Sequence, residues 1–407
     1  MNSRRPLVFA SFVIFLDALG IGLMMPVMPD LIMEVSGVGL DEAVRIGGYL
    51  LLSYAGMQFL FAPMIGAISD KVGRRPVFIA ALAMLALDYA IMASAMSLSW
   101  LFVGRVLSGL AGSTWAVAFS CAADVVPQEK RGGAFGAVGA AGALGLVLGP
   151  VIGGFAGGIS TRLPFQISAV LAGGGAIFVI LLFQETLSLQ LRRALDFKAF
   201  NPIGALSRLS RDRFLQQGFV ILFIISFSMH THTAIWSYYG ILKFGWSPLQ
   251  IGLTAAVYGV SMIVVRAGLA GRAEKRMGAR SAARWSILFA APSYAMVAVA
   301  PDMTTTILAI VLGSISGIAL PMLQALMSQA VHSDEQGYLQ GAIASISGLA
   351  ALLAPLVMSQ VLYFSMNEPV SLPGAPFLLV SVLLVGATIL LWRATAGNEQ
   401  AGAKADK

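Results

Sequence analysis

Twelve mainly apolar runs constrain the fold of this chain more than any other feature, because each is close to the roughly 20 residues that a helix needs to cross a bilayer. They cover residues 7–29, 46–68, 76–96, 99–122, 133–157, 163–183, 214–236, 249–271, 282–300, 303–328, 338–363 and 377–392. Hydrophobic residues make up 58% of the 407 positions and charged residues 11%, less than half of the share of about 25% in soluble domains. We therefore expect an all-α membrane protein with twelve transmembrane helices and lipid as its main solvent.

The basic residues are divided unevenly between the predicted loops. With the N-terminus in the cytoplasm, only Arg45, Arg162 and Lys243 of the 26 Lys and Arg residues lie in external loops. Because positively charged loops stay on the cytoplasmic side, both termini are predicted to be cytoplasmic. The net charge of +7 then reflects topology and contact with anionic lipid, and no nucleic-acid binding is expected, because no soluble domain presents the basic residues.

The longest polar connection, residues 185–213, divides the chain into two six-helix halves. A shift of 205 residues lays one half on the other, carrying Gly73 to Gly278 and Pro150 to Pro355. Two motifs that share one offset indicate parallel repeats, an arrangement found in transporters whose halves rock around a midplane site. We predict two pseudo-repeats, residues 1–184 and 214–396, a cytoplasmic central loop, residues 185–213, and a cytoplasmic tail, residues 397–407.

The turn between the second and third predicted helices, GAISDKVGRR, concentrates charge in a chain that is poor in it. Gly66 and Gly73 suit a close helix approach and a tight turn, and Asp70 and Arg74 are spaced to reach neighbouring helix ends. A carboxylate can cap the positive N-terminus of another helix, and we expect Asp70 to do so at the start of the eleventh helix. Two interpretations stay open: a latch of the cytoplasmic gate, or a topology anchor.

Three charged residues lie well inside predicted helices: Asp17, Asp88 and Arg105. Charges inside lipid are costly, so each is a candidate functional residue. The two carboxylates lie halfway along their helices, where a carboxyl group can serve as a proton carrier, and Arg105 keeps its charge and can tune a carboxylate beside it. A purely structural role, as a static ion pair or a support of the cavity, is the alternative. The shift of 205 residues carries all three to uncharged residues, so we expect proton chemistry in the first half.

The fifth predicted helix contains small residues at three- and four-residue spacing. They are Gly136, Gly139, Gly142, Gly145, Gly149, Gly153 and Gly154, with Pro150 among them. Small residues let a facing helix approach closely, and proline weakens the helical hydrogen bonding. A nucleotide-binding loop is excluded because no strand precedes the run and no Gly-Lys-Ser/Thr follows it. We expect a packing seam that also acts as a hinge, with static packing as the alternative.

The end of the seventh predicted helix contains two histidines and several aromatic residues. His230 and His232 lie two residues apart, on nearly opposite faces of a helix, and no third ligand is visible, so we expect no metal site. An aromatic belt at the outer membrane boundary is predicted from Trp236, Tyr238, Tyr239 and Trp246, with a binding cage as the alternative.

Several motifs resemble the drug:proton antiporters of the major facilitator superfamily. GAISDKVGRR resembles their signature between the second and third helices, GLVLGPVIGG resembles that of the fifth helix, and LDALGIGLMMPVMP and GRVLSGLAGS fit the same branch. LDYAIMA, GIALPMLQALMSQ and QGYLQGAIASISGLAALLAPL are similar to the tetracycline efflux proteins, and the likeness covers nearly the whole chain.

The resemblance implies a bacterial inner-membrane exporter that exchanges an amphipathic drug for entering protons. Its implied cargo is a tetracycline carried as a complex with a divalent cation, and it implies a working monomer whose only energy source is the proton gradient, without a cofactor. The resemblance also pairs Arg105 with Asp17 and Arg74 with Asp124. It makes His230 and Gln324 substrate contacts, for which a hydrogen-bonded helix contact is the open alternative.

One residue departs from the tetracycline pattern: those exporters carry a further carboxylate in the ninth helix, where this chain has Ala290. Three alternatives therefore stay open: a proton-coupled nutrient or metabolite carrier of the same fold, a multidrug exporter that does not act on tetracycline, and a membrane sensor. A primary pump or a membrane enzyme has little support, because the chain shows no ATP-binding motif and no nucleophile elbow. We expect no catalytic and no metal-binding residues.

Overall fold

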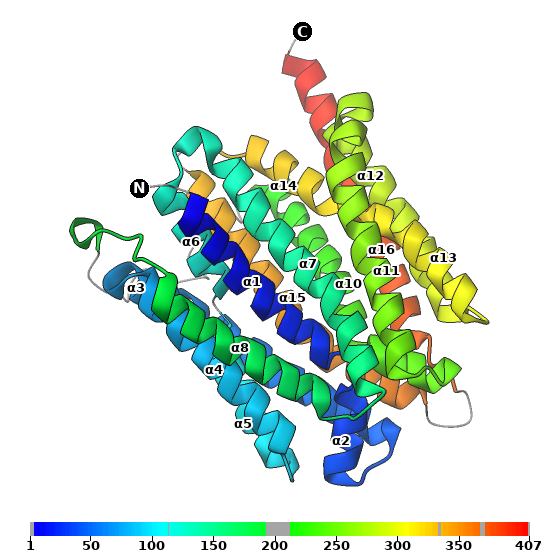
Figure 1. Cartoon of the computed structure of the whole chain (residues 1–407). Coiled ribbons are helices and arrows are strands. Elements are labelled where there is room, and N and C mark those ends of the chain that lie inside the picture. Colours follow the sequence, from blue (N-terminus) through cyan, green and yellow to red (C-terminus); the bar gives the residue numbers. More distant parts are fainter. Residues whose placement is uncertain (1–3, 113, 193–211, 333–334, 367–370, 406–407) are drawn as a thin grey trace. The chain divides into compact units, whose positions relative to one another are not determined.

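The computed structural model describes residues 4–112, 114–192, 212–332, 335–366 and 371–405. Within these ranges every regular element is a helix (Figure 1). Most of the predicted central loop, residues 193–211, lies outside the described residues, as do residues 406 and 407 of the predicted tail. The rest of that tail continues the last helix as far as Ala405.

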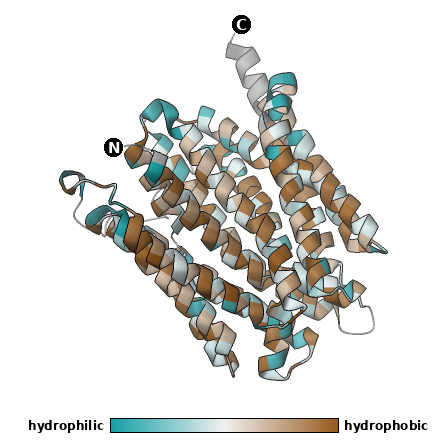
Figure 2. Cartoon of the chain, in the orientation of Figure 1, coloured by the Kyte–Doolittle hydropathy of each residue, from teal (hydrophilic) through white to brown (hydrophobic). Residues whose placement is uncertain are grey.

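Eleven helices of the described residues are long and apolar enough to cross a membrane. One of them, Pro248–Val299, is 52 residues long and has a non-helical backbone at Gly278, with φ 76° and ψ 158°. It therefore contains the eighth and ninth predicted spans, and the prediction of twelve spans is confirmed. Figure 2 shows apolar residues along the helices and hydrophilic residues gathered towards many of their ends.

The part of the chain that contains the first six spans has eight α-helices, of which the short α2 is not a span. They are α1 (Arg4–Met24), α2 (Met28–Ser36), α3 (Leu40–Val72), α4 (Arg74–Ser94), α5 (Leu98–Ala111), α6 (Thr114–Val125), α7 (Arg131–Gly157) and α8 (Leu163–Leu182). Short 3-10 helices follow α6, at Gln128–Lys130 (η1), and α8, at Leu189–Leu191 (η2). The fourth span consists of α5 and α6 because the helix is interrupted at Gly112.

The second six spans contain two irregular segments of their own. The elements are α10 (Arg213–Phe244), α11 (Pro248–Val264), the π-helix η4 (Val265–Leu269), α12 (Ala270–Val299), α13 (Met303–Gly313), the 3-10 helix η5 (Ser314–Ile318), α14 (Ala319–Gln329), α15 (Gln336–Ser365) and α16 (Ala375–Ala405). The tenth span is thus made of α13, η5 and α14.

Contacts between residues divide the chain into two compact units. The first unit contains residues 1–200 and 240–256, and the second contains residues 201–239 and 257–407. Residues 240–256, which fall in the predicted C-terminal half, belong to the first unit because the start of α11 packs against the C-terminal end of α7: a Cβ added to Gly154 would lie 2.9 Å from Leu249 Cα.

Within the first unit, α1 packs along α7 and α4 packs along α8 (Figure 1). Between α1, α4, α6, α7 and α8 lies a hydrophobic core whose members include Ile14, Phe78, Val138 and Val179, all fully buried. This core fixes α1 and α4, the two helices that carry the intramembrane carboxylates.

The repeat is visible in the backbone conformation. Gly73, at the charged turn, has φ 107° and ψ 169°, and its counterpart Gly278 has φ 76° and ψ 158°. Residues that carry a Cβ atom rarely adopt such backbone angles, so both positions require glycine. The shift of 205 residues also carries Gly112, at the break of the fourth span, to Gly317 within η5, so both halves interrupt their fourth span at the same place.

Candidate functional site

A buried ion pair joins α5 to α4 in the first unit. Arg105 Nη2 donates to Asp88 Oδ2, and the two side chains are 1% and 0% exposed. Gly104 makes room for the carboxylate, because a Cβ there would lie 2.5 Å from Asp88 Oδ1. The guanidinium group also contacts two thioethers, with Nη1 3.2 Å from Met24 Sδ and Nη2 3.0 Å from Met92 Sδ. The cation is therefore matched by one anion and by soft, polarisable neighbours.

The other intramembrane carboxylate, Asp17 on α1, has different surroundings. It is 2% exposed, and its Oδ2 accepts a hydrogen bond of 2.8 Å from the hydroxyl group of Thr114, the first residue of α6. No cation pairs with Asp17 among the residues that the structure describes. Asp17 is thus held by a neutral donor at the break of the fourth span.

The pairing of Arg105 with Asp17 is therefore wrong. Asp17 meets the fourth span at Thr114, nine residues after Arg105 and beyond the break at Gly112. The guanidinium group instead points to α4, where it binds Asp88, and Gly104 of α5 leaves space for that carboxylate. The two carboxylates consequently have separate partners, one ionic and one neutral.

At the charged turn, Arg74 begins α4 and is 5% exposed. Its Nε donates to Asp124 Oδ2 of α6 at 2.9 Å, which confirms the pairing with Asp124. Its Nη1 donates to Asp70 Oδ1 at 2.6 Å and to Ser69 Oγ at 2.9 Å, both on α3. One guanidinium group thus ties three helices together at this end of the first unit.

Glu185, which follows α8, caps the N-terminus of α4. Its two carboxylate oxygens accept the backbone N–H groups of Arg74, at 2.9 Å, and Arg75, at 3.1 Å. Gly73 leaves the space that the carboxylate occupies, since a Cβ there would lie 2.5 Å from Glu185 Cδ. Sequence reasoning missed Glu185, although an acidic residue directly after the sixth apolar run, on the side of the charged turn, was a usable signal.

Of two further expectations for the charged turn, one is wrong and one stays a prediction. Gly66 lies inside α3, and a Cβ there would meet no described atom within 4 Å, so the close helix approach expected at Gly66 is wrong. Asp70 binds Arg74, and its predicted contact with the start of the eleventh span stays a prediction.

Glycines of α7 pack directly on the backbone of α1. A Cβ on Gly145 would lie 2.6 Å from the carbonyl oxygen of Phe15, and one on Gly149 would lie 2.7 Å from that of Leu19. Gly153 would likewise overlap the backbone of Leu23. Only glycine permits this spacing, so the predicted packing seam is present between the helix that carries Asp17 and the helix that carries the antiporter motif.

Gly142 also meets α1, through the side chain of Ile14, but Gly136, Gly139 and Gly154 do not share this seam. Gly136 and Gly139 have no described atom within 4 Å of an added Cβ, whereas Gly154 faces α11. Pro150 lies inside α7 and brings its carbonyl group against Gly252 of α11. The predicted hinge thus has α1 on one side and the start of α11 on the other, and its movement stays a prediction.

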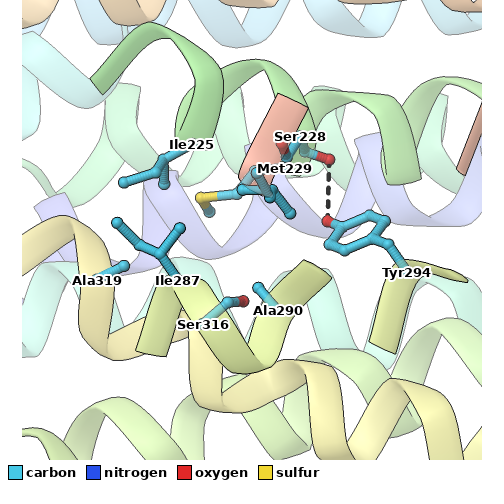
Figure 3. Close-up of a pocket in the computed structure, with 9 residues that line it drawn as sticks. Ile225, Ser228, Met229, Ile287, Ala290, Tyr294, Ser316 and Ala319 are labelled. Carbon is cyan, nitrogen blue, oxygen red and sulfur yellow. Dashed lines mark hydrogen bonds between the residues drawn. The ribbon is translucent and has the colours of Figure 1, made fainter. Parts of the chain in front are cut away.

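Two neighbouring cavities lie in the second unit and share Tyr294 and Ser316 in their linings. In the first cavity, shown in Figure 3, Tyr294 Oη donates to the carbonyl oxygen of Ser228 at 3.1 Å. Ala290 also lines this cavity, together with apolar side chains such as Met229. An apolar residue, Ala290, therefore occupies the position at which the tetracycline exporters carry a carboxylate in the ninth span.

Neither His230 nor Gln324 lines these two cavities. Both are partly buried, on α10 and α14 respectively. Their roles as substrate contacts stay predictions.

The aromatic residues at the end of α10 do not form a belt that faces lipid, so this expectation is wrong. Trp236 and Tyr239 are fully buried, and Tyr238 and Trp246 are 4% and 5% exposed. In the second unit the rings of Trp236 and Tyr239 pack against Phe377 of α16, at 6.2 and 4.7 Å between centroids. They are core residues of the helix bundle.

Comparisons with known proteins agree with this architecture. A family model of the Major Facilitator Superfamily matches residues 10–355 and 223–405. The chain is 36% identical over 361 residues to the class C tetracycline resistance protein of Escherichia coli, covering 89% of this chain and 90% of that protein. It is 33% identical over 408 residues to the class B protein of Escherichia coli, covering 98% and 99%.

Solved structures at lower identity share the fold. The human organic anion transporter MFSD10 gives a TM-score of 0.71 at 23% identity, covering 96% of this chain and 100% of that chain. The nucleoside transporter NupG gives a TM-score of 0.75 at 14% identity, covering 97% and 99%.

Proposed function

Because the chain belongs to the major facilitator superfamily, a family of multi-pass membrane transporters and not of enzymes, we propose that it exports a tetracycline in exchange for entering protons. The support for the substrate is that relatives with about a third of their residues in common are named tetracycline resistance proteins. In this proposal the drug crosses as its complex with a divalent cation, and a monomer works in the bacterial inner membrane with both termini in the cytoplasm.

The observation that carries the proton coupling is the environment of Asp17. Its buried carboxyl group accepts a hydrogen bond from Thr114, a neutral donor, and has no cation partner among the described residues, so no fixed positive charge opposes protonation. Asp88 is neutralised by Arg105. Asp17 therefore takes and releases the coupled proton. The ion pair of Asp88 and Arg105 keeps α4 and α5 in position.

The backbone seam gives this site a route to conformational change. Asp17 lies on α1 between Phe15 and Leu19, whose carbonyl groups touch the glycines of α7. A change in charge at Asp17 acts on a helix whose position against α7 is set by backbone contact. In this proposal the turn with Asp70, Arg74 and Asp124 controls the cytoplasmic gate, because Asp70 is free to exchange Arg74 for another partner as the gate closes.

Substitution of Asp17 by Asn tests the proposed coupling. Cells that produce the Asp17→Asn variant should accumulate tetracycline as cells without the protein do, while the variant is present in the membrane and still binds drug. The matched control, Asp41→Asn, changes an exposed carboxylate at the start of α3 and should keep efflux that is sensitive to an uncoupler. Uncoupler-sensitive efflux at the wild-type rate by Asp17→Asn would exclude Asp17 as the coupling group.

A second candidate function is favoured by Ala290, which stands where the tetracycline exporters carry a ninth-helix carboxylate. A multidrug exporter that does not act on tetracycline would not need that carboxylate. Accumulation assays with a panel of amphipathic drugs distinguish the two: unchanged tetracycline accumulation with extrusion of another drug would reject tetracycline and keep the antiporter.

A further inference from the structure

The second cavity of the second unit lies where the repeat places the ion pair of the first unit. The shift of 205 residues carries Asp88 to Ser293 and Arg105 to Ile310, and both of these residues line the cavity. The other polar residues of its lining are His232 of α10, Tyr258 of α11, Tyr294 of α12 and Ser316 of η5. The place that holds two charges in the first unit thus holds neutral side chains and open space in the second.

His232 is buried, and one of its nitrogens lacks a protein partner. Its side chain is 5% exposed, and its Nε2 has no hydrogen-bond partner among the described residues. Both faces of the imidazole ring are covered: Trp236 stacks on one at 4.2 Å between centroids, and Tyr258 stacks on the other at 4.3 Å. Only the edge of the ring is left for a polar contact, and a buried nitrogen without such a contact is costly.

The size of the cavity limits what can supply this contact. The cavity has a volume of about 20 Å³, and about 10 to 15 Å³ suffices for one water. A drug molecule needs a site many times larger. The lining contains no carboxylate among the described residues, so a metal cation would find no anionic ligand.

We propose that this cavity is a binding site for one ordered water molecule, held by Nε2 of a neutral His232. Water can donate to a ring nitrogen or accept from it, so it satisfies either tautomer of the imidazole. Ser293 supplies a second contact, because its hydroxyl group donates to the carbonyl oxygen of Ala309 at 3.1 Å and its lone pairs stay available. The second unit then contributes a hydrated, uncharged centre where the first contributes an ion pair.

Solid-state NMR of the full-length protein in lipid vesicles, with ¹⁵N-labelled histidine, tests this site. The chain has only three histidines, so His230→Gln and His332→Gln each remove one ring signal and assign the third to His232 without altering it. Magnetisation transferred from water should build up on the His232 ring at a rate within about twofold of the rate on the exposed His332 ring. The reason is that a bound water lies in contact with the His232 nitrogen.

The same spectra decide against the proposal in two ways. A His232 ring that receives no magnetisation from water while His332 does would show a dry cavity. Titration of the His232 signals between about pH 5 and pH 8 would show a charge-carrying group instead of a neutral one. Loss of only the His232 signal in His232→Gln, with the other two rings unchanged, verifies the assignment; if that variant does not fold, the first two variants still provide it.

Discussion

The buried pair of Asp88 and Arg105 allows a quantitative test of the first unit. Arg105→Met removes the cation and keeps an unbranched, apolar side chain beside Met24 and Met92, and Asp88→Asn removes the anion with little change in shape. Each single variant leaves an uncompensated charge in a place that is at most 1% exposed. The double variant leaves two neutral groups.

The expected costs follow from this burial. Removal of one partner of a buried ion pair typically lowers the free energy of unfolding by about 3 to 5 kcal/mol, because the remaining charge stays desolvated. Replacement of both charges by neutral groups of similar volume is often nearly neutral. The double variant should therefore be more stable than either single variant, with a coupling energy of at least about 3 kcal/mol.

Reversible unfolding in mixed micelles with increasing SDS gives the four free energies of this cycle. The partly buried pair of Glu42 and Arg45 on α3, with side chains 31% and 37% exposed, is the control with greater access to water. Its cycle, with Glu42→Gln and Arg45→Met, should give a coupling energy of about 0 to 1 kcal/mol. Single variants at Asp88 and Arg105 that each cost less than about 1 kcal/mol, or a double variant less stable than both, would refute the reasoning.

Three further predictions concern the charged turn, the seam and a helix cap. Asp70→Asn should slow transport while drug binding is kept, because it weakens a contact of the gate and leaves the interior unchanged; loss of binding would instead indicate a structural anchor. Gly149→Ala should lower the free energy of unfolding by about 1 to 3 kcal/mol, as overpacking does, whereas Gly139→Ala, with open space around it, should raise it by about 0.5 to 1 kcal/mol; equal effects in SDS unfolding would contradict the seam. The backbone N–H of Thr305 donates to Asp302 at the N-cap of α13 and holds the pKa of that carboxyl group below its usual value. Stability from its charge is therefore present above about pH 4 and lost as the pH falls further, so melting curves of the wild type and Asp302→Asn should converge in acid and differ at neutral pH.

The span architecture could be predicted from sequence because lipid imposes one strong requirement on each helix. The apolar runs at 249–271 and 282–300 were correctly predicted as two spans, although helical structure is found on both sides of the boundary between them. The charged stretch between the runs contains Gly278, where the backbone is not helical. The offset of the repeat predicted that Gly278 resembles Gly73, and their backbone angles confirm it. The resemblance to the major facilitator superfamily is confirmed as well.

The partners of the buried charges could not be predicted in the same way. Sequence places Arg105 on the fourth span, but which neighbour it meets depends on the rotation of α5 and on its height against α1 and α4. The only local signal was Gly104, which leaves space for Asp88 on that face of α5. Arg74 and Asp124 were paired correctly because both lie at helix ends on one side of the membrane, where few other partners are within reach.

The aromatic residues of α10 show a further limit. Aromatic residues near a predicted membrane boundary are typical of a belt, but the same residues also fill helix contacts. Trp236 and Tyr239 are three residues apart and so share one face of α10, and that face packs against Phe377. Only the packing of α16, distant in sequence, decides between the two interpretations.

The seam between α1 and α7 has a genetic consequence. At Gly149 the nearest atoms all belong to the backbone of α1, which no codon change can remove, so a harmful substitution there has no compensating substitution at the point of contact. Gly142 differs, because the atoms nearest to it are side-chain atoms of Trp115 and Ile14. A selection for second-site suppressors should therefore restore variants at Gly142 through a smaller residue at position 115 or 14, and should recover none on α1 for Gly149.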